Sequence, residues 1–388
     1  MSAYSLEQER AIRSGRLVHD WAQSRLISDD QRQRMLPELQ VDLRRTNKFL
    51  RVTLFIFGLI ILQSVAGLIA IAIGLSEEVA AGVLCGGIAA GCFWLTNLLV
   101  TRHKLYRFGI EEAAALASVI LAGSAALLIS TIATGHVDDV QIVIGLAAAA
   151  VVAFALFRRF GFVYAAVIAM VLAVAAAFIP GASDIVHRVG AAVILAVCFV
   201  VARAERERHG REFPGDNYAI IEAAAWIGLY LVINLQISRW LSSPEDRTPF
   251  YWITYVLTWL MPAAGLWIAI RDRHRMLLDV NIVMAIVTLM TNKGYLGTPR
   301  QPYDPVAFGV LLIAVAMGVR RWLASGTDGS RGGYVAERLV ESEKERLGLV
   351  GTISVVHQGP VASPAHQPEP PAVGGGGRSG GAGATGSF

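Results

Sequence analysis

The sequence predicts an all-α fold, a bundle of about ten transmembrane helices with both termini in the cytoplasm. Of its 388 residues, 54% are hydrophobic and only 16% are charged, and the mean hydropathy is +0.52. This composition is typical of polytopic membrane proteins. The apolar residues form runs of about 20, which is the length of helix that crosses a hydrocarbon core of ~30 Å. The charged residues lie between these runs, and the cations favour alternate junctions.

Residues 1–51 predict a small cytoplasmic helical hairpin that precedes the first apolar run. Ser5 and Ser28 are each followed three residues later by a glutamine, which is the capping-box pattern of a helix start. Pro37 disturbs the second helix, although the pattern allows that helix to continue into the first span. The hairpin is either a helical pair on the membrane surface or a module that docks a cytoplasmic protein partner.

Residues 52–323 predict the ten-span bundle. The fourth and sixth runs are short for a complete span, and polar residues interrupt the ninth. The expected runs are 52–74, 79–100, 112–134, 140–157, 160–179, 185–202, 219–240, 250–270, 276–292 and 305–323.

The distribution of cations predicts the orientation of the spans. Junctions assigned to the cytoplasm carry most of the arginines and lysines, whereas the opposite junctions carry few, and this bias orients membrane helices. The cytoplasmic set is Arg44, Arg45, Lys48, Arg51, Arg102, Lys104, Arg107, Arg158, Arg159, Arg203, Arg206, Arg208, Arg211, Arg271, Arg273, Arg275, Arg320 and Arg321. The opposite set is Arg188, Arg239, Arg247, Lys293 and Arg300. The net charge of +4 therefore reflects membrane orientation, and we expect the lipid bilayer rather than nucleic acid as a partner.

The composition changes after the last span. Residues 324–357 predict a cytoplasmic helical segment with a charged, solvated face. Residues 358–388 are rich in glycine, proline and alanine, and contain too little apolar side chain to offset the entropy of ordering, so we expect a disordered tail.

The sequence contains no recognisable catalytic or metal-binding motif. There is no P-loop, no nucleophile elbow, no His-Glu-x-x-His and no cysteine–histidine zinc spacing. Cys85, Cys92 and Cys198 all lie inside apolar runs, where cysteine is usually a buried thiol. We therefore predict no catalytic residue, no metal and no cofactor, and the sequence leans against an enzyme without deciding the question.

Polar residues recur on one face of the seventh and ninth spans. In the seventh span they follow at intervals of four, and in the ninth they share nearly the same azimuth on a helix of 3.6 residues per turn. The residues are Glu222, Trp226, Tyr230, Asn234, Asn281, Thr288 and Asn292. They predict either a polar, ligand-binding cavity between the two spans, with Glu222 as its ionisable group, or interhelical hydrogen bonds that hold the bundle together.

One external loop, at 291–305, is rich in proline, glycine and tyrosine. Lys293 and Arg300 are among the few external cations there, and Tyr295 and Tyr303 offer a surface that can cover the outer end of the bundle. These residues predict contact with an anion or a lipid headgroup. The alternative is that the cations only snorkel or cap helix carbonyl groups.

Two regions resemble a known group of proteins. The stretches 292–297, 303–305, 320–323 and 332–334, together with 21–28 before the basic first span, are similar to uncharacterised bacterial multi-pass membrane proteins with a domain of unknown function. The resemblance covers the N-terminal region and the last three spans. It implies a location in the bacterial inner membrane and implies no particular activity.

Two functions remain as hypotheses. The first is a non-catalytic membrane protein that acts through interactions of its cytoplasmic segments. The second is a secondary transporter or flippase with a polar cavity between spans seven and nine. Ten spans would form two five-helix halves of opposite orientation, as inverted-repeat transporters require, but the halves show no clear sequence match. The oligomeric state stays open.

Overall fold

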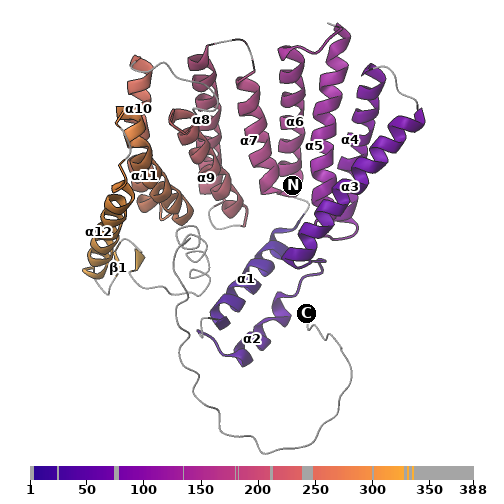
Figure 1. Cartoon of the computed structure of the whole chain (residues 1–388). Helices are drawn as coiled ribbons and strands as arrows, with labels where there is room; N and C mark the ends of the chain where they lie inside the picture. Colours follow the sequence, from indigo (N-terminus) through magenta and orange to yellow (C-terminus); the bar gives the residue numbers. More distant parts are fainter. Residues whose placement is uncertain are drawn as a thin grey trace, which may run out of the picture. The chain divides into compact units, whose positions relative to one another are not determined.

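The fold is helical almost throughout, as the sequence predicts (Figure 1). The computed structural model describes residues 4–23, 26–73, 78–133, 135–179, 181, 183–209, 213–237, 248–298, 301–326, 330–331 and 334–335. Within these ranges the only strands are β1 (Ser330–Arg331) and β2 (Tyr334–Val335), which pair antiparallel. They occupy positions where the sequence predicts the start of a C-terminal helix, so that expectation is wrong there. Residues 336–388, with the predicted disordered tail, lie outside the described residues.

The N-terminal region forms α1 (Leu6–Gln23), α2 (Asp29–Met35) and a 3₁₀ turn, η1 (Pro37–Leu39). Both predicted capping boxes are present, and the hydroxyl groups of Ser5 and Ser28 each accept an N–H three residues later at 3.2 Å. α2 ends before Pro37, and residues 40–47 are not helical. The possibility that this helix continues into the first span is therefore wrong, because proline cannot supply the backbone donor that a continuing helix needs.

The apolar face of α1 packs against the transmembrane helices. Tyr4 and Ile12 belong to the same buried cluster as Phe160 and Ile221. The Tyr4 hydroxyl donates to the carbonyl oxygen of Leu105 at 2.9 Å. Tyr4 and α1 thus contribute to the bundle's core, whereas α2 has no buried residue.

Ten apolar helices follow, one for each predicted run. They are α3 (Lys48–Ile73), α4 (Glu78–Thr101), α5 (Ile110–Ser130), α6 (Asp139–Phe160), α7 (Val163–Ala177), α8 (Asp184–Arg208), α9 (Phe213–Ile233), α10 (Pro249–Arg271), α11 (Arg275–Leu296) and α12 (Asp304–Ala324). A second 3₁₀ turn, η2 (Thr131–Ala133), follows α5.

Eight of the described helices are long and apolar enough to cross a membrane, and two apolar helices are shorter, Val163–Ala177 and Asn217–Ile233. The fourth and sixth predicted runs are not short, because α6 and α8 have 22 and 25 residues. Both helices continue through their charged ends, Arg158–Arg159 in α6 and Arg203–Arg208 in α8. The short helices are instead α7 and the apolar part of α9.

Helices α3, α4 and α6 pack closely around α5 (Figure 1). A Cβ at Gly82 of α4 would lie only 2.9 Å from Ile129 Cγ1 of α5, and a Cβ at Gly123 of α5 would lie 3.0 Å from Ala149 Cβ of α6. Glycine at these positions lets the helices approach closely. By contrast, Gly87 and Gly91 on another face of α4 have nothing within 4 Å.

Helices α7 to α11 position the candidate site. α9 packs against α7, α8, α10 and α11, and α11 also packs against α10. A second buried cluster lies among these helices and includes Leu195, Trp226, Tyr230, Met261 and Met284. The polar face of α9 is therefore directed into a group of helices rather than outward.

Candidate functional site

The polar stripes of α9 and α11 face one another along a line that we call the α9–α11 seam, made by Glu222, Trp226, Tyr230, Asn234, Asn281 and Thr288. Trp226 Nε1 donates to Asn281 Oδ1 at 2.9 Å. The hydroxyl groups of Tyr230 and Thr288 are hydrogen-bonded at 2.8 Å. Asn234 Nδ2 donates to the Tyr230 hydroxyl at 3.0 Å. The structure thus joins five of the seven predicted stripe residues by hydrogen bonds, and the sixth, Glu222, lies one turn before Trp226 on α9.

The seam is buried and internally hydrogen-bonded. Glu222, Asn234 and Asn281 have no exposed surface, and Tyr230 and Thr288 are each 2% exposed. Unpaired polar groups in an apolar bundle are costly, and the direct pairing of these side chains removes that cost. The contacts are those expected of helix-holding hydrogen bonds, while Glu222 adds an ionisable group that helix packing alone does not require.

A third helix, α10, completes the seam, and the sequence analysis missed it. Thr288 Oγ1 lies 3.2 Å from the carbonyl oxygen of Thr258 and donates to it. Gly265 leaves room for the buried amide of Asn281, because a Cβ there would lie 2.0 Å from Asn281 Oδ1. A signal was present in the sequence, since Thr254, Thr258, Gly265 and Ala269 recur at helical spacing and all are buried.

Asn292 does not join the seam. Its Oδ1 accepts from the Tyr255 hydroxyl of α10 at 2.8 Å, and Thr291 takes the place expected of it, because Asn234 Nδ2 donates to Thr291 Oγ1 at 3.2 Å. α11 packs against both α9 and α10, so its last turn presents Asn292 to α10. The shared azimuth on α11 was correct, but azimuth alone does not say which neighbour is met.

Tyrosines close one end of the seam. α11 continues to Leu296, so the first six residues of the predicted loop at 291–305 are helical. Tyr295 is 3% exposed, and its hydroxyl accepts the N–H of Leu235 at 2.7 Å. The Tyr251 hydroxyl donates to the carbonyl oxygen of Tyr295 at 3.0 Å and accepts from Gln236 Nε2 at 3.1 Å. Tyr295 is therefore a buried structural contact rather than a surface cover.

The remaining predicted loop residues have different surroundings. Lys293 Nζ lies 2.6 and 2.7 Å from the two carboxylate oxygens of Asp304, which ties the end of α11 to the start of α12. Tyr303 is 65% exposed, and Arg300 lies outside the described residues. Because Lys293 already has a carboxylate partner, an anion would have to compete with Asp304 for it.

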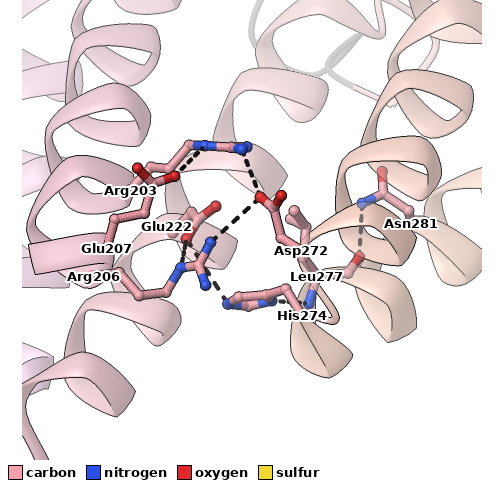
Figure 2. Close-up of polar contacts among 8 residues, drawn as sticks. All are labelled: Arg203, Arg206, Glu207, Glu222, Asp272, His274, Leu277 and Asn281. Carbon is pink, nitrogen blue, oxygen red and sulfur yellow. Dashed lines mark hydrogen bonds and ion pairs between the residues drawn. The ribbon is translucent and has the colours of Figure 1, made fainter. Parts of the chain in front are cut away.

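Charged side chains meet at the other end of the seam, where the last turns of α8, the first half of α9 and the α10–α11 turn converge. Figure 2 shows Arg206 between Glu222 and Asp272. Arg206 Nε donates to Glu222 Oε2 at 2.6 Å, and Arg203 Nη2 donates to Asp272 Oδ2 at 2.5 Å. We call Arg203, Arg206, Glu207, Glu222, Asp272 and His274 the charge cluster.

His274 is held in a defined tautomer at this cluster. Its Nδ1 accepts the N–H of Leu277 at 2.8 Å and so caps the start of α11. When the ring is neutral, the proton is therefore on Nε2, which lies 3.8 Å from Glu222 Oε2. Burial, together with the positive charge of Arg206, lowers the pKa of His274 to about 4. The imidazole is neutral at neutral pH.

The sequence analysis assigned the cluster's arginines to membrane orientation and singled out neither Asp272 nor His274. One local signal existed, because Arg203 and Arg206 lie three residues apart and so share a face of α8. Nothing in the sequence says that this face meets Glu222. Among the described residues, no three His, Cys, Asp or Glu side chains lie close enough together to hold a metal ion.

The fold and the exposed apolar surface define the class of this chain as a multi-pass α-helical membrane protein. The apolar stretches of α3 and α12 have almost no buried residue, and side chains such as Ile71 and Val306 are exposed. Such surfaces are stable against lipid and unfavourable in water. The chain matches no family model, no curated protein and no solved structure.

Proposed function

We propose that this protein is a secondary transporter of the bacterial inner membrane whose substrate path follows the α9–α11 seam. One observation carries the proposal. The fully buried carboxylate of Glu222 lies at the end of a row of polar side chains that continues along α9 and α11 to Asn234. Ionisable groups inside a membrane bundle are expensive to bury, and they mark substrate, ion or proton pathways more often than packing contacts.

The proposed orientation places the charge cluster at the cytoplasmic end. It follows from the cation bias between junctions, with ten spans and both termini in the cytoplasm, so that α7 and α9 are short spans. The resemblance to bacterial multi-pass membrane proteins supports the same location. In this orientation the packed aromatic side chains of Tyr251 and Tyr295, whose ring centroids lie 5.1 Å apart, close the external end of the seam.

The energetics of the seam suit a pathway that opens and closes. Interhelical hydrogen bonds in membranes contribute only ~0.6 kcal/mol each on average, so exchanging a few of them for water or substrate contacts costs little. The Arg206–Glu222 pair is different, because separating a buried ion pair without a substitute partner is costly. We therefore expect α9 and α11 to part along Trp226, Tyr230 and Asn234, while Glu222 keeps Arg206 as its partner for as long as its carboxylate is charged.

Thiol labelling tests the proposal. Asn234, Asn281 and Thr288 are each changed to cysteine in a background that lacks Cys85, Cys92 and Cys198, and a membrane-impermeant reagent is applied from each side. Labelling at these positions supports a water-filled path.

The matched control is Ile282→Cys, the outward-facing neighbour of Asn281, which is 45% exposed and which we expect to face lipid and stay unlabelled. Protection of every seam position from both sides, with reactive cysteines in loops, would show a packed bundle and overturn the transport proposal.

The alternative function, binding of a cytoplasmic protein partner, would need exposed apolar side chains on the cytoplasmic segments. The apolar side chains Tyr4, Ile12 and Val18 in and before α1 are buried within the chain, which leaves them unavailable to a partner. α2, described throughout, has no buried residue, and Met35 and the following Leu36 are exposed. The exposed apolar side chains that a cytoplasmic partner could use therefore include those of α2 and of Leu17 and Trp21 on α1, while the segment after residue 335 lies outside the described residues.

A further inference from the structure

Three buried polar atoms of the charge cluster have no hydrogen-bond partner. They are Glu222 Oε1, His274 Nε2 and Arg206 Nη2. The side chain of Glu222 is fully buried and that of His274 is 5% exposed. Buried polar atoms are nearly always paired, so three unpaired atoms in one cluster point to a small ion or proton that binds there.

The charges of the cluster balance except for that of the exposed Glu207. Two guanidinium groups, of Arg203 and Arg206, lie against the three carboxylates of Glu207, Glu222 and Asp272. His274 is neutral, and α1 and α7 approach α9 through the apolar residues around Ile221. On α11, the nearby Arg275 and Asp279 are exposed. Glu207 is 59% exposed, so its charge is screened by water, and the less exposed members Arg203, Arg206, Glu222 and Asp272 are balanced. What the cluster can receive is therefore decided by its unpaired atoms.

The unpaired atoms favour a proton over a metal cation. Metal ions such as Ca²⁺ and Mg²⁺ need several oxygen ligands. Only one of the three unpaired atoms is an oxygen, whereas His274 Nε2 and Arg206 Nη2 are hydrogen-bond donors that would repel a metal ion. A proton needs a single acceptor, and Glu222 Oε1 is an acceptor without a partner.

We propose that Glu222 is a proton-binding site, and that Arg206 moves from Glu222 to Asp272 when the proton binds. The inference rests on the proposed transport function, to which it adds the proton as the coupling ion. The proton joins Oε1, the carboxylate loses its charge, and the ion pair with Arg206 ends.

The partners for the protonated arrangement are already in place. Arg206 Nη2 lies 3.7 Å from Asp272 Oδ2, and His274 Nε2 lies 3.8 Å from Glu222 Oε2. A small movement lets Arg206 donate to Asp272 and lets His274 donate to the oxygen that Arg206 has left. Two of the unpaired atoms then gain partners. Trp226, one turn beyond Glu222, connects the change to Asn281 in the seam.

Infrared difference spectroscopy on the purified full chain in lipid nanodiscs tests proton binding. As the pH is lowered from mildly alkaline to mildly acidic, the unmodified chain should show one carboxylic acid C=O band that is missing in Glu222→Gln, while the bands of other buried carboxyl groups such as Glu9 stay. The matched control is Glu207→Gln, which removes a partly exposed carboxylate of the same cluster and should keep the band. A set of titrating C=O bands that Glu222→Gln leaves unchanged overturns the proposal, because other buried carboxyl groups such as Glu9 would then account for all of them.

A thermodynamic cycle tests the movement of Arg206. The loss of unfolding temperature caused by Asp272→Asn is measured in the unmodified chain and in Glu222→Gln, which mimics the protonated state. We expect a larger loss in Glu222→Gln, and we expect the excess to disappear when Arg206→Gln is added. Equal losses in both backgrounds mean that Arg206 does not change partners.

The two proposals fail in different ways. A titrating Glu222 band together with protected seam cysteines leaves the proton site standing and removes transport. Labelled seam cysteines without a Glu222 band leave transport standing and remove the proton site.

Discussion

Replacing Gly265 by alanine tests whether the seam depends on the space that α10 leaves for Asn281. The new Cβ would lie 2.0 Å from Asn281 Oδ1 and 2.4 Å from its Cγ, so the buried amide has to move. That amide accepts from Trp226 Nε1 at 2.9 Å and donates to the carbonyl oxygen of Leu277 at 2.7 Å. The displacement therefore breaks at least the bond to Trp226.

The magnitude follows from two costs. A buried indole N–H left without an acceptor costs ~1–3 kcal/mol, which exceeds the ~0.6 kcal/mol of a mean interhelical bond because the donor cannot turn to water. Inserting a methyl group into a packed core adds ~1–3 kcal/mol. We expect Gly265→Ala to lower the free energy of unfolding by ~2–6 kcal/mol, measured by equilibrium unfolding in mixed detergent micelles.

Two further variants make the Gly265 test specific. Gly309→Ala in α12, where nothing lies within 4 Å of the new Cβ, should leave stability unchanged or slightly raised, because alanine favours helix. Adding Asn281→Ala to Gly265→Ala removes the clash and should recover part of the loss. Equal stability of Gly265→Ala and Gly309→Ala would refute the packing argument.

Three other predictions concern the ends of the seam and the N-terminal helix. Arg206→Gln should cost ~3–5 kcal/mol of unfolding free energy, because it leaves the buried Glu222 carboxylate unpaired. Adding Glu222→Gln should recover most of this loss. Additive losses of the two variants in denaturant unfolding would contradict the pairing. Tyr295→Phe removes the acceptor of the Leu235 N–H and should cost ~1–2 kcal/mol, seen as faster hydrogen exchange at that amide, and unchanged exchange would argue against the bond. Burial raises the pKa of Glu9 from 4.5 to about 7, so the folded state favours the protonated acid. Docking of α1 should then be strongest below pH 4.5, weaken by at most about 3 kcal/mol up to pH 7 and stay constant above it, while Glu9→Gln removes this dependence in limited proteolysis.

The polar stripe of α9 shows how far helical periodicity reaches. Glu222, Trp226, Tyr230 and Asn234 were predicted to share a face, and all four are buried on the side of α9 that meets α11. Periodicity fixes the azimuth of a side chain on its own helix, but it contains no information about the neighbouring helix. Asn292 therefore had the correct azimuth and the wrong partner.

The charge cluster could not be predicted from the sequence. Arg206 was one of several cations at a basic junction, and His274 was one of eight scattered histidines. Their roles depend on the last turns of α8 meeting the α10–α11 turn, a contact between residues more than sixty positions apart. The capping of α11 by His274, by contrast, is a local contact that a sequence search for caps could find.

The sequence by itself determined the class of structure, because apolar runs long enough to cross a bilayer leave the backbone no alternative to internally hydrogen-bonded helices. It also determined the helix starts at Ser5 and Ser28, since a capping box acts within one turn. The end of α2 before Pro37 was not foreseen, because the pattern also allowed that helix to continue into the first span. Only the tertiary structure decided that α10 completes the seam, that α1 packs onto the bundle, and that Arg206 lies between Glu222 and Asp272. Those contacts join distant parts of the chain, and helix packing, not local residue pattern, chooses among them.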